Sequence, residues 1–315
     1  MPPEPAPGIP AAPIAITGAT GFIGRALCAR LCTSGHASVR ALVRRTTAAL
    51  PARIGIVRGD LLDRAALARL LDGAGTLFHC AGAVRGADRR AFDAVNVEGT
   101  RQLLEAVQRH APHCRVMLLS SLAAREPQLS DYAASKRAGE SLLAQIASLD
   151  AVILRPTAVY RPGDVELKPL LQAFARGLAP VPGTRDARVT LIHVQDLVDA
   201  MMLTATAPLG SGPFELSDAR VEGYRWSEIA DAVTAITGRK VQLLPIPRGL
   251  LSGISRITVA LSRITGHAPM LSPGKVRELT WPDWSCDTAP FSEATGWTPR
   301  IDLEAGLRSV LARVA

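Results

Sequence analysis

Tyr132 and Lys136 are the side chains of this sequence best placed to transfer a proton. Residues four positions apart lie on one face of a helix, about one turn from each other. Their ordinary pKa values, about 10 and about 10.4, are too high for proton exchange near neutral pH. A nearby ammonium stabilises phenolate, so we expect Lys136 to lower the pKa of Tyr132 into the range of a general acid/base.

A glycine triplet near the start of the chain predicts the cofactor that would react beside Tyr132 and Lys136. It follows the apolar run 14–16 and precedes a helix-like run at 25–31. A strand that turns directly into a helix points the unpaired N–H groups and positive dipole end of the helix at a bound anion. The glycines permit the tight turn, the approach of a pyrophosphate and close packing of helix on strand. We therefore predict a nicotinamide dinucleotide and hydride transfer. The predicted contacts in this segment are Gly18, Thr20, Gly21, Phe22, Ile23 and Gly24.

The residue after the second predicted strand, 39–43, bears on the choice of dinucleotide. Cofactors without a 2′-phosphate usually meet an Asp or Glu at this point. This chain has Arg44 and Arg45 instead, and guanidinium groups suit a phosphate. NADP is therefore favoured over NAD. The alternative that these are ordinary surface arginines stays open.

Asp60 and Leu61 follow the third predicted strand, 54–57. They are predicted to border the adenine. Asp60 is also a candidate cap for a helix beginning near Arg64, and the two interpretations are compatible.

Further segments complete a family pattern with the glycine triplet and the Tyr–Lys pair. They are residues 59–61, 79–82, 96–100, 120–121, 154–156, 192–196 and 296–299. Over nearly its whole length, from 14 to about 311, the chain resembles an extended short-chain dehydrogenase/reductase. This group includes the NAD(P)-dependent epimerases and dehydratases.

The resemblance implies roles for individual residues. Tyr132 would be the general acid/base, and Lys136 would tune it and hold the nicotinamide ribose. Ser121, rather than Ser120, would hydrogen-bond the reacting oxygen. Asn96 would anchor the nicotinamide side, with a helix cap as the alternative. The resemblance also assigns to the cofactor's path Ala81, Gly82 and Pro156.

Departures from the nucleotide-sugar enzymes of the group indicate a different substrate. Residues 122–125 replace their Val-Tyr-Gly, residues 154–160 lack their Arg-Tyr/Phe-x-Asn, and Gly82 replaces a more usual alanine. The chain thus resembles the branch that acts on hydroxysteroid-like, flavonoid-like or other apolar alcohols and ketones. The first alternative is a nucleotide-sugar epimerase or dehydratase with bound NAD. It would need a cluster that binds the substrate's pyrophosphate, for which the candidates are Arg161, Arg185 and Arg188. The second is a non-catalytic dinucleotide-binding protein, which the intact catalytic set argues against.

Alternating apolar and helix-like runs predict an α/β fold, a doubly wound parallel sheet (Rossmann) with a smaller, discontinuous C-terminal substrate-binding subdomain. Later strands are expected at 76–80, 115–119, 152–154 and, at the edge, 214–216. Residues 1–12 read as a disordered proline-rich tail. We assign 13–163 and 187–220 to the NAD(P)-binding domain, and 164–186 and 221–315 to the substrate-binding cap.

Two helices, 167–178 and 249–264, are expected to roof the substrate, with residues 280–284 at the rim. Trp281, Trp284 and Met270 are candidates for an apolar pocket. An apolar stripe at helical spacing runs through the second helix. It comprises Leu250, Leu251, Ile254, Ile257, Leu261 and Ile264. We favour a cap helix packed over the substrate, and contact of 249–264 with a membrane surface is the alternative.

Composition limits the remaining classes of partner. The net charge is +8, but only four of the 36 basic residues are lysines, no long basic run exists, and aromatic residues make up 4%. We therefore expect a small-molecule substrate and no nucleic-acid binding. The five cysteines form no Cys-x2-Cys pair, so we expect free thiols and no metal. The start of the chain lacks a signal-peptide pattern, so we expect a cytoplasmic protein without a transmembrane segment. The resemblance implies a homodimer.

Overall fold

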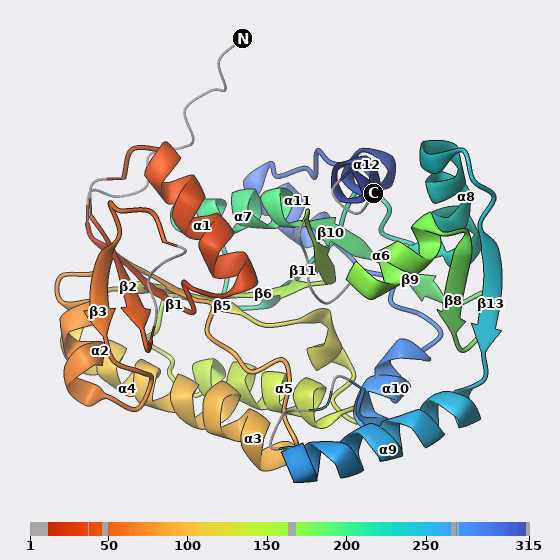
Figure 1. The fold of residues 1–315 in the computed structure, drawn as a ribbon. Coiled ribbons are helices and arrows are strands. Elements are labelled where there is room, and N and C mark those ends of the chain that lie inside the picture. The colour runs from red at the N-terminus through yellow and green to blue at the C-terminus, as the bar shows by residue number, and fades with distance from the viewer. Residues whose placement is uncertain are drawn as a thin grey trace.

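A seven-stranded parallel sheet forms the centre of the computed structural model, which describes residues 12–36, 38–45, 50–162, 168–265, 269 and 271–312 (Figure 1). Its strand order is β3-β2-β1-β4-β5-β6-β11, and every neighbouring pair is parallel. The strands are β1 (Ile14–Thr17), β2 (Val39–Val43), β3 (Gly55–Arg58), β4 (Thr76–His79), β5 (Arg115–Leu119), β6 (Ala151–Pro156) and β11 (Pro213–Leu216). These strands confirm the predicted doubly wound sheet, including its late edge strand.

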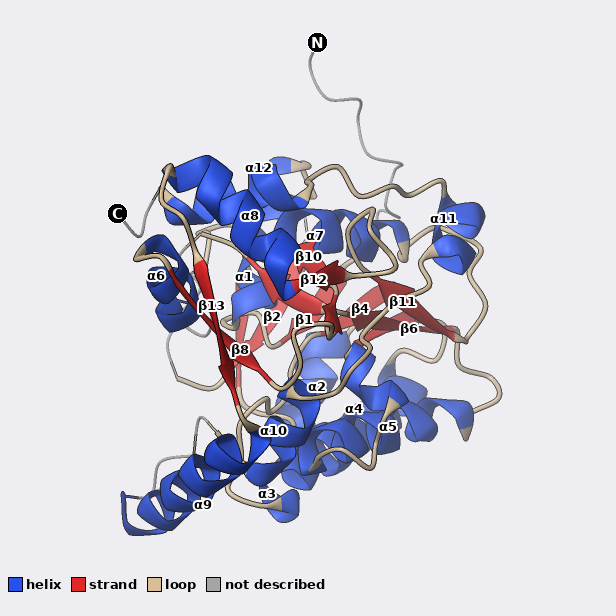
Figure 2. Cartoon of the chain, turned by 90° about the vertical axis from the view of Figure 1, so that its right-hand side faces the viewer, coloured by secondary structure: helices blue, strands red, loops and turns tan. Residues whose placement is uncertain are grey.

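Helices cover both faces of this sheet, as Figures 1 and 2 show. One layer contains α1 (Phe22–Thr33), α7 (Val194–Leu203) and α11 (Ala289–Thr295); the other contains α2 (Arg64–Leu71), α4 (Thr100–His110) and α5 (Asp131–Ala144). A hydrophobic core lies on each face of the sheet, and successive residues of β1 point into opposite cores. Ile14 and Ile16 pack toward α1, while Ala15 packs toward α2. Phe291 and Trp297, from the segment assigned to the cap, join the α1 side.

The order in which the chain adds strands to the sheet reverses between β1 and β4. The chain runs outward from β1 through β2 to β3 and then returns to place β4 on the other side of β1. Open α/β sheets bind ligands at the carboxyl ends of the strands beside such a switch point. The residues that follow β1, β4 and β5 therefore meet where a ligand is expected.

A second group of elements packs around its own core, which contains Phe174, Trp226 and Leu307. Its helices are α6 (Lys168–Ala175), α8 (Trp226–Thr237) and α12 (Leu303–Leu311). Three two-stranded sheets accompany them among the described residues: β7 (Ala158–Tyr160) with β10 (Leu191–His193), β9 (Arg188–Val189) with β12 (Tyr224–Arg225), and β8 (Leu178–Pro182) with β13 (Gln242–Ile246).

The other described elements are four short helices and one long helix. They are α3 (Arg89–Asp93), the π-helix η1 (Ala94–Gly99), the 3-10 helix η2 (Leu122–Arg125), α9 (Arg248–Thr265) and α10 (Pro273–Leu279). The helix expected at 167–178 is shorter, since Leu178 begins β8, and Leu167 lies outside the described residues. The tail expected at 1–12 also lies outside them, apart from Ala12.

In the part of the chain that the structure describes, no helix is both long and apolar enough to cross a membrane. The same residues hold no group of three His, Cys, Asp or Glu side chains that could bind a metal. All five cysteines are described and are free thiols. Cys28 is fully buried in the core.

Candidate active site

The turn after β1 has the geometry of a dinucleotide site. Gly18 has φ +71°, and a Cβ there would lie 2.4 Å from the Ala81 nitrogen. A Cβ on Gly24 would lie 2.2 Å from the Gly18 carbonyl oxygen, so helix and strand pack in direct backbone contact. α1 begins with Gly21 as its N-cap, and no side chain of a described residue caps its first N–H groups. These groups fit the phosphates of a dinucleotide, which the helix dipole also favours.

A chain of buried hydrogen bonds braces this turn against the neighbouring strand. The Ala81 N–H donates to Thr17 Oγ1 (3.3 Å), which donates to His79 Nδ1 (2.6 Å). His79 Nε2 donates in turn to Thr100 Oγ1 (3.0 Å), whose hydroxyl donates to the Asn96 carbonyl (2.9 Å). The direction of the last bond determines the tautomer of the imidazole. Burial, with a smaller contribution from Lys136, lowers the pKa of His79 to about 3, so the ring is neutral.

Asn96 joins the loop after β4 to the helix that carries the catalytic pair. It lies in η1, and π-helical turns often occur at functional sites. Its Oδ1 accepts from the Ala83 N–H (2.8 Å), and its Nδ2 donates to the Ala83 carbonyl (3.0 Å) and to Ser135 Oγ (2.8 Å). The alternative of a helix cap is wrong, because the side chain bonds to a loop and to α5 instead.

Tyr132 begins the first turn of α5 and reaches back to the end of β5. Ser130 caps this helix by accepting from the Ala133 N–H (2.9 Å). The half-buried Tyr132 ring packs with its centroid 6.0 Å from that of Phe92, and its phenol lies near enough to Ser121 for the serine hydroxyl to affect the pKa of the phenol. The structure thus brings together the side chains predicted to handle the reacting oxygen.

The pKa of Tyr132 is raised to about 12 rather than lowered. Burial is the largest cause; the Ser121 hydroxyl acts in the opposite direction, and the charge of Glu278 adds to the rise. The Lys136 ammonium donates to the Leu119 carbonyl (2.9 Å). The expectation that Lys136 lowers the Tyr132 pKa is therefore wrong for the chain by itself, because desolvation dominates.

Glu278 is a neighbour of Tyr132 that the sequence analysis missed. It lies on α10, where its buried carboxylate accepts from Ser130 Oγ and from Lys275 Nζ (3.0 Å). No motif connects it to the Tyr–Lys pair, so only the fold reveals the contact. It places a negative charge near the phenol from a segment far along the chain.

The variant Glu278→Gln should shift the pH profile of turnover downward. Removing the carboxylate charge removes one cause of the raised Tyr132 pKa, while the amide oxygen can still accept from Ser130. Reduction needs protonated Tyr132 and oxidation needs phenolate, so the alkaline limb of reduction and the acidic limb of oxidation should both move to lower pH. Measuring kcat/KM against pH checks this. A profile that stays in place would show that Glu278 does not act on the phenol, and Glu304→Gln, in an exposed pair on α12, is the control.

Lys136 lies against the residues after β4. Burial lowers its pKa to about 8, while the charges of Cys80 and Glu140 oppose the fall. A Cβ on Gly82 would lie 2.9 Å from Nζ and 3.2 Å from Asn96 Oδ1. An ammonium has three donors, and the Leu119 carbonyl takes one. Lys136 is therefore placed to donate to a ligand that enters beside Gly82.

A buried ion pair anchors α5, and sequence reasoning assigned it no role. Arg155 on β6 donates to both oxygens of Glu140, from Nε at 2.9 Å and from Nη2 at 2.6 Å. Ser120 Oγ donates to the same carboxylate (2.5 Å) and is therefore engaged in the anchor. The sequence held a signal for Glu140, because Tyr132, Lys136 and Glu140 are spaced by four residues and therefore share one face of the helix.

The remaining predicted cofactor residues lie around the carboxyl ends of β2, β3 and β6. Arg44 is exposed and makes no ion pair with another described residue. Asp60 is exposed and accepts from the Leu62 N–H (2.9 Å). Its proposed capping role is wrong, because Asp63 caps α2 instead (3.0 Å). Leu61 packs beside Gly99, and Pro156 ends β6 in a buried position.

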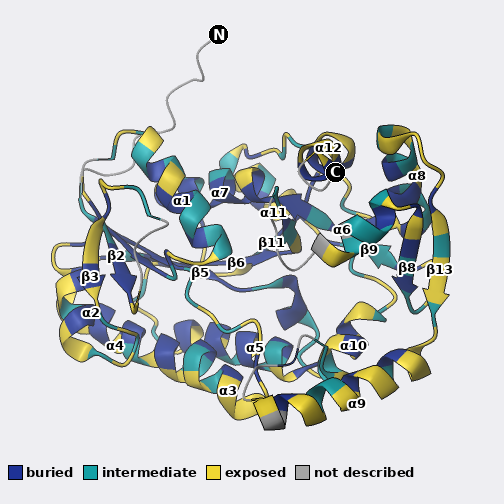
Figure 3. Cartoon of the chain, in the orientation of Figure 1, coloured by how far each residue is buried: buried dark blue, intermediate teal, exposed yellow. Residues whose placement is uncertain are grey.

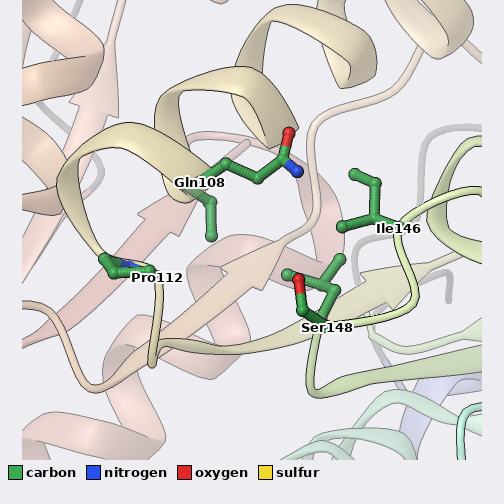
Figure 4. A pocket seen from close by; sticks show the side chains of 6 residues that line it. Gln108, Pro112, Ile146 and Ser148 are labelled. Carbon is green, nitrogen blue, oxygen red and sulfur yellow. The ribbon is translucent and has the colours of Figure 1, made fainter.

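The expected apolar rim is only partly described. Trp281 and Trp284 are half-buried, and the Trp284 indole donates to the Glu278 carbonyl (3.0 Å). Met270 lies outside the described residues. A small hollow between the ends of α4 and α5, near Gln108 and Ile146, has no titratable side chain (Figure 4). It lies at the amino ends of β5 and β6, the sheet edge opposite Tyr132, so it does not belong to this site.

Comparison with known proteins places this geometry among nucleotide-dependent enzymes. The model of the NAD-dependent epimerase/dehydratase family matches residues 14–215. A ceramide reductase of Caulobacter vibrioides is 39% identical over 283 residues, which cover 89% of this chain and 88% of that protein. A 3 beta-hydroxysteroid dehydrogenase/Delta 5-->4-isomerase of Mycobacterium tuberculosis is 28% identical over 306 residues, covering 84% and 80%. The structure of MoeE5 in complex with UDP-glucuronic acid and NAD has a TM-score of 0.70, with 25% identity, and covers 96% of this chain and 98% of that one.

Proposed function

Since the chain belongs to the NAD-dependent epimerase/dehydratase family and is an NAD(P)-dependent oxidoreductase of the extended short-chain type, we propose that it reduces a ketone of an apolar small molecule with NADPH. The observation that carries the proposal is the grouping of Tyr132 with Ser121 after the end of β5, with Lys136 one helical turn away. The named activities of the ceramide reductase and the hydroxysteroid dehydrogenase support an apolar substrate.

Each of the proposed catalytic side chains has a separate role in the reduction of a carbonyl group. The N-terminus of α1 and Lys136 would hold NADPH, which would supply the hydride for the carbonyl carbon. Ser121 hydrogen-bonds the carbonyl oxygen, and the Tyr132 hydroxyl transfers its proton to that oxygen as negative charge develops there. Lys136, beside Gly82, would hold the nicotinamide ribose. The raised pKa of Tyr132 supports the reducing direction, because the phenol stays protonated at neutral pH.

Cofactor preference tests the role of Arg44. The exposed guanidinium follows β2, where it is placed to pair with the 2′-phosphate of NADPH. Arg44→Asp should reduce the ratio of kcat/KM for NADPH to that for NADH by about tenfold or more, because a charge-assisted hydrogen bond is replaced by repulsion. Arg53→Asp, an exposed site at the amino end of β3, is the matched control. An unchanged ratio in Arg44→Asp would remove Arg44 from the cofactor site.

The nucleotide released on denaturation separates the proposal from its main alternative. A reductase exchanges its cofactor in each turnover, so purified protein should be empty or hold NADP and should oxidise NADPH with long-chain or steroid-like ketones. Stoichiometric retained NAD would favour a nucleotide-sugar epimerase, in which the hydride returns to the substrate. A panel of apolar ketones assayed by NADPH absorbance is the direct test. Family membership argues against the non-catalytic alternative.

We also propose that the protein is a cytoplasmic homodimer that pairs through α4 and α5. Both helices present charged and polar side chains on their outer faces, among them Arg101, Glu105 and Arg137. Light scattering of the purified chain would give the dimer mass, and a monomer at all concentrations would exclude this arrangement.

A further inference from the structure

Helix α9 buries a row of small hydroxyl residues and exposes an apolar face. Leu250, Ile254, Ile257 and Leu261 are 57%, 41%, 62% and 53% exposed, respectively. Their spacing of four, three and four places them on one face. The expectation that this stripe packs over the substrate is wrong for these four residues, although Leu251 is buried. Figure 3 shows the exposed side along the outer rim of the molecule.

The buried side of α9 is lined by small hydroxyl residues. Ser255 and Ser262 are buried, and their hydroxyls donate to carbonyls of the same helix. Thr258 Oγ1 donates to the Leu271 carbonyl (2.5 Å), which ties α9 to the segment before α10. Serines whose hydroxyls are satisfied within the helix can face the protein at little cost. The helix is therefore held on its polar side, and four large apolar side chains face outward.

The positive charge of the segment around α9 favours an anionic lipid surface over a second copy of the chain as the partner of the exposed apolar face. Residues 232–277 contain no Asp or Glu. They contain seven basic residues: Arg239, Lys240, Arg248, Arg256, Arg263, Lys275 and Arg277. Arg248 and Arg256 are exposed on α9 itself. A second copy of this face would bring two cationic surfaces together, whereas an anionic lipid headgroup layer would neutralise them.

We propose that α9 lies on an anionic lipid membrane, with its exposed Leu and Ile side chains inserted among the acyl chains. An amphipathic helix with arginines beside an apolar face is suited to the interface rather than to crossing the bilayer. The docking goes beyond the proposed function and does not depend on it. A second part, supply of an apolar substrate from the bilayer, does rest on the proposed function.

The position of α9 connects the membrane face to the catalytic helix. α9 packs on α10. α10 in turn contacts the start of α5, because Arg277 Nε donates to the Leu129 carbonyl (2.7 Å) and Gly274 packs against Ser130. Tyr132 follows Ser130 by two residues. Docking through α9 would therefore place the bilayer close to the segment that positions the general acid.

Vesicle flotation of the full chain tests the docking independently of catalysis. Binding is expected to vesicles of phosphatidylcholine mixed with phosphatidylglycerol, with much weaker binding to phosphatidylcholine alone and at high salt. The variant Ile257→Ser with Leu261→Ser should bind roughly a hundredfold more weakly, about tenfold per lost side chain. Leu62→Ser, at an apolar residue 60% exposed on another surface, should bind like the natural chain.

Three outcomes would overturn the proposal. They are no binding to anionic vesicles, binding that the double variant retains, and self-association in light scattering that the double variant alone abolishes. The last outcome would assign the face to a second copy of the chain. Turnover of a water-soluble ketone distinguishes the proposals: if the natural chain floats with vesicles but reduces no ketone, the proposed function fails and the docking stands.

Discussion

Tyr132→Phe should remove most turnover while cofactor affinity stays nearly unchanged. The substitution removes the hydroxyl that lies near Ser121 and keeps the ring that packs against Phe92. Loss of a positioned general acid costs about a hundredfold to ten-thousandfold in rate. Steady-state kcat with NADPH and a ketone substrate measures the first effect. Titration of NADPH by fluorescence measures the second.

A second tyrosine supplies the matched control. Tyr160 is buried at the end of β7, and its hydroxyl has no hydrogen-bond partner among the described residues. Tyr160→Phe should therefore leave kcat near that of the natural chain, since the same chemical change removes no bond. If Tyr132→Phe retained the turnover of Tyr160→Phe, Tyr132 would not be the general acid and the proposed mechanism would be wrong.

Glu140→Ala should reduce the free energy of unfolding by about 3–5 kcal/mol, because it leaves the buried Arg155 guanidinium without its charge partner. Ser120 would lose its acceptor in the same change. Activity should also fall, since the pair anchors the helix that carries Tyr132 and Lys136. Urea unfolding followed by circular dichroism gives the midpoint and slope for the comparison.

Two further variants test whether the loss of stability comes from leaving a buried charge unpaired rather than from the loss of any ion pair. Glu140→Leu combined with Arg155→Met replaces both charges with apolar groups and should recover much of the lost stability. Glu304→Ala breaks the exposed pair with Arg308 and should cost less than about 1 kcal/mol. A Glu140→Ala variant as stable as Glu304→Ala would show that the buried pair does not anchor α5.

The sequence was sufficient to predict the strands, the glycine turn and the helix face, because each of these depends on residues that are close together in the chain. The apolar runs at β1, β2 and β5 predicted buried parallel strands, and the glycine triplet predicted the turn into α1. A four-residue spacing predicted that Tyr132 and Lys136 share a helix face, and they do. Each inference depends on backbone geometry or on neighbours within one helical turn, which the order of residues specifies.

The pKa of Tyr132, its acidic neighbour and the exposed side of α9 were decided by the tertiary structure. Desolvation depends on every segment packed around the phenol, and Glu278 reaches it from a helix far along the chain. Periodicity identified the apolar stripe of α9, but a stripe has the same pattern whether it faces a core or the outside. Sequence alone determined the strand–turn–helix turn and the spacing of the residues that we propose to be catalytic. Packing between distant segments decided protonation, helix anchoring and which apolar face stays exposed, because burial and charge contacts join residues that are not neighbours in the chain.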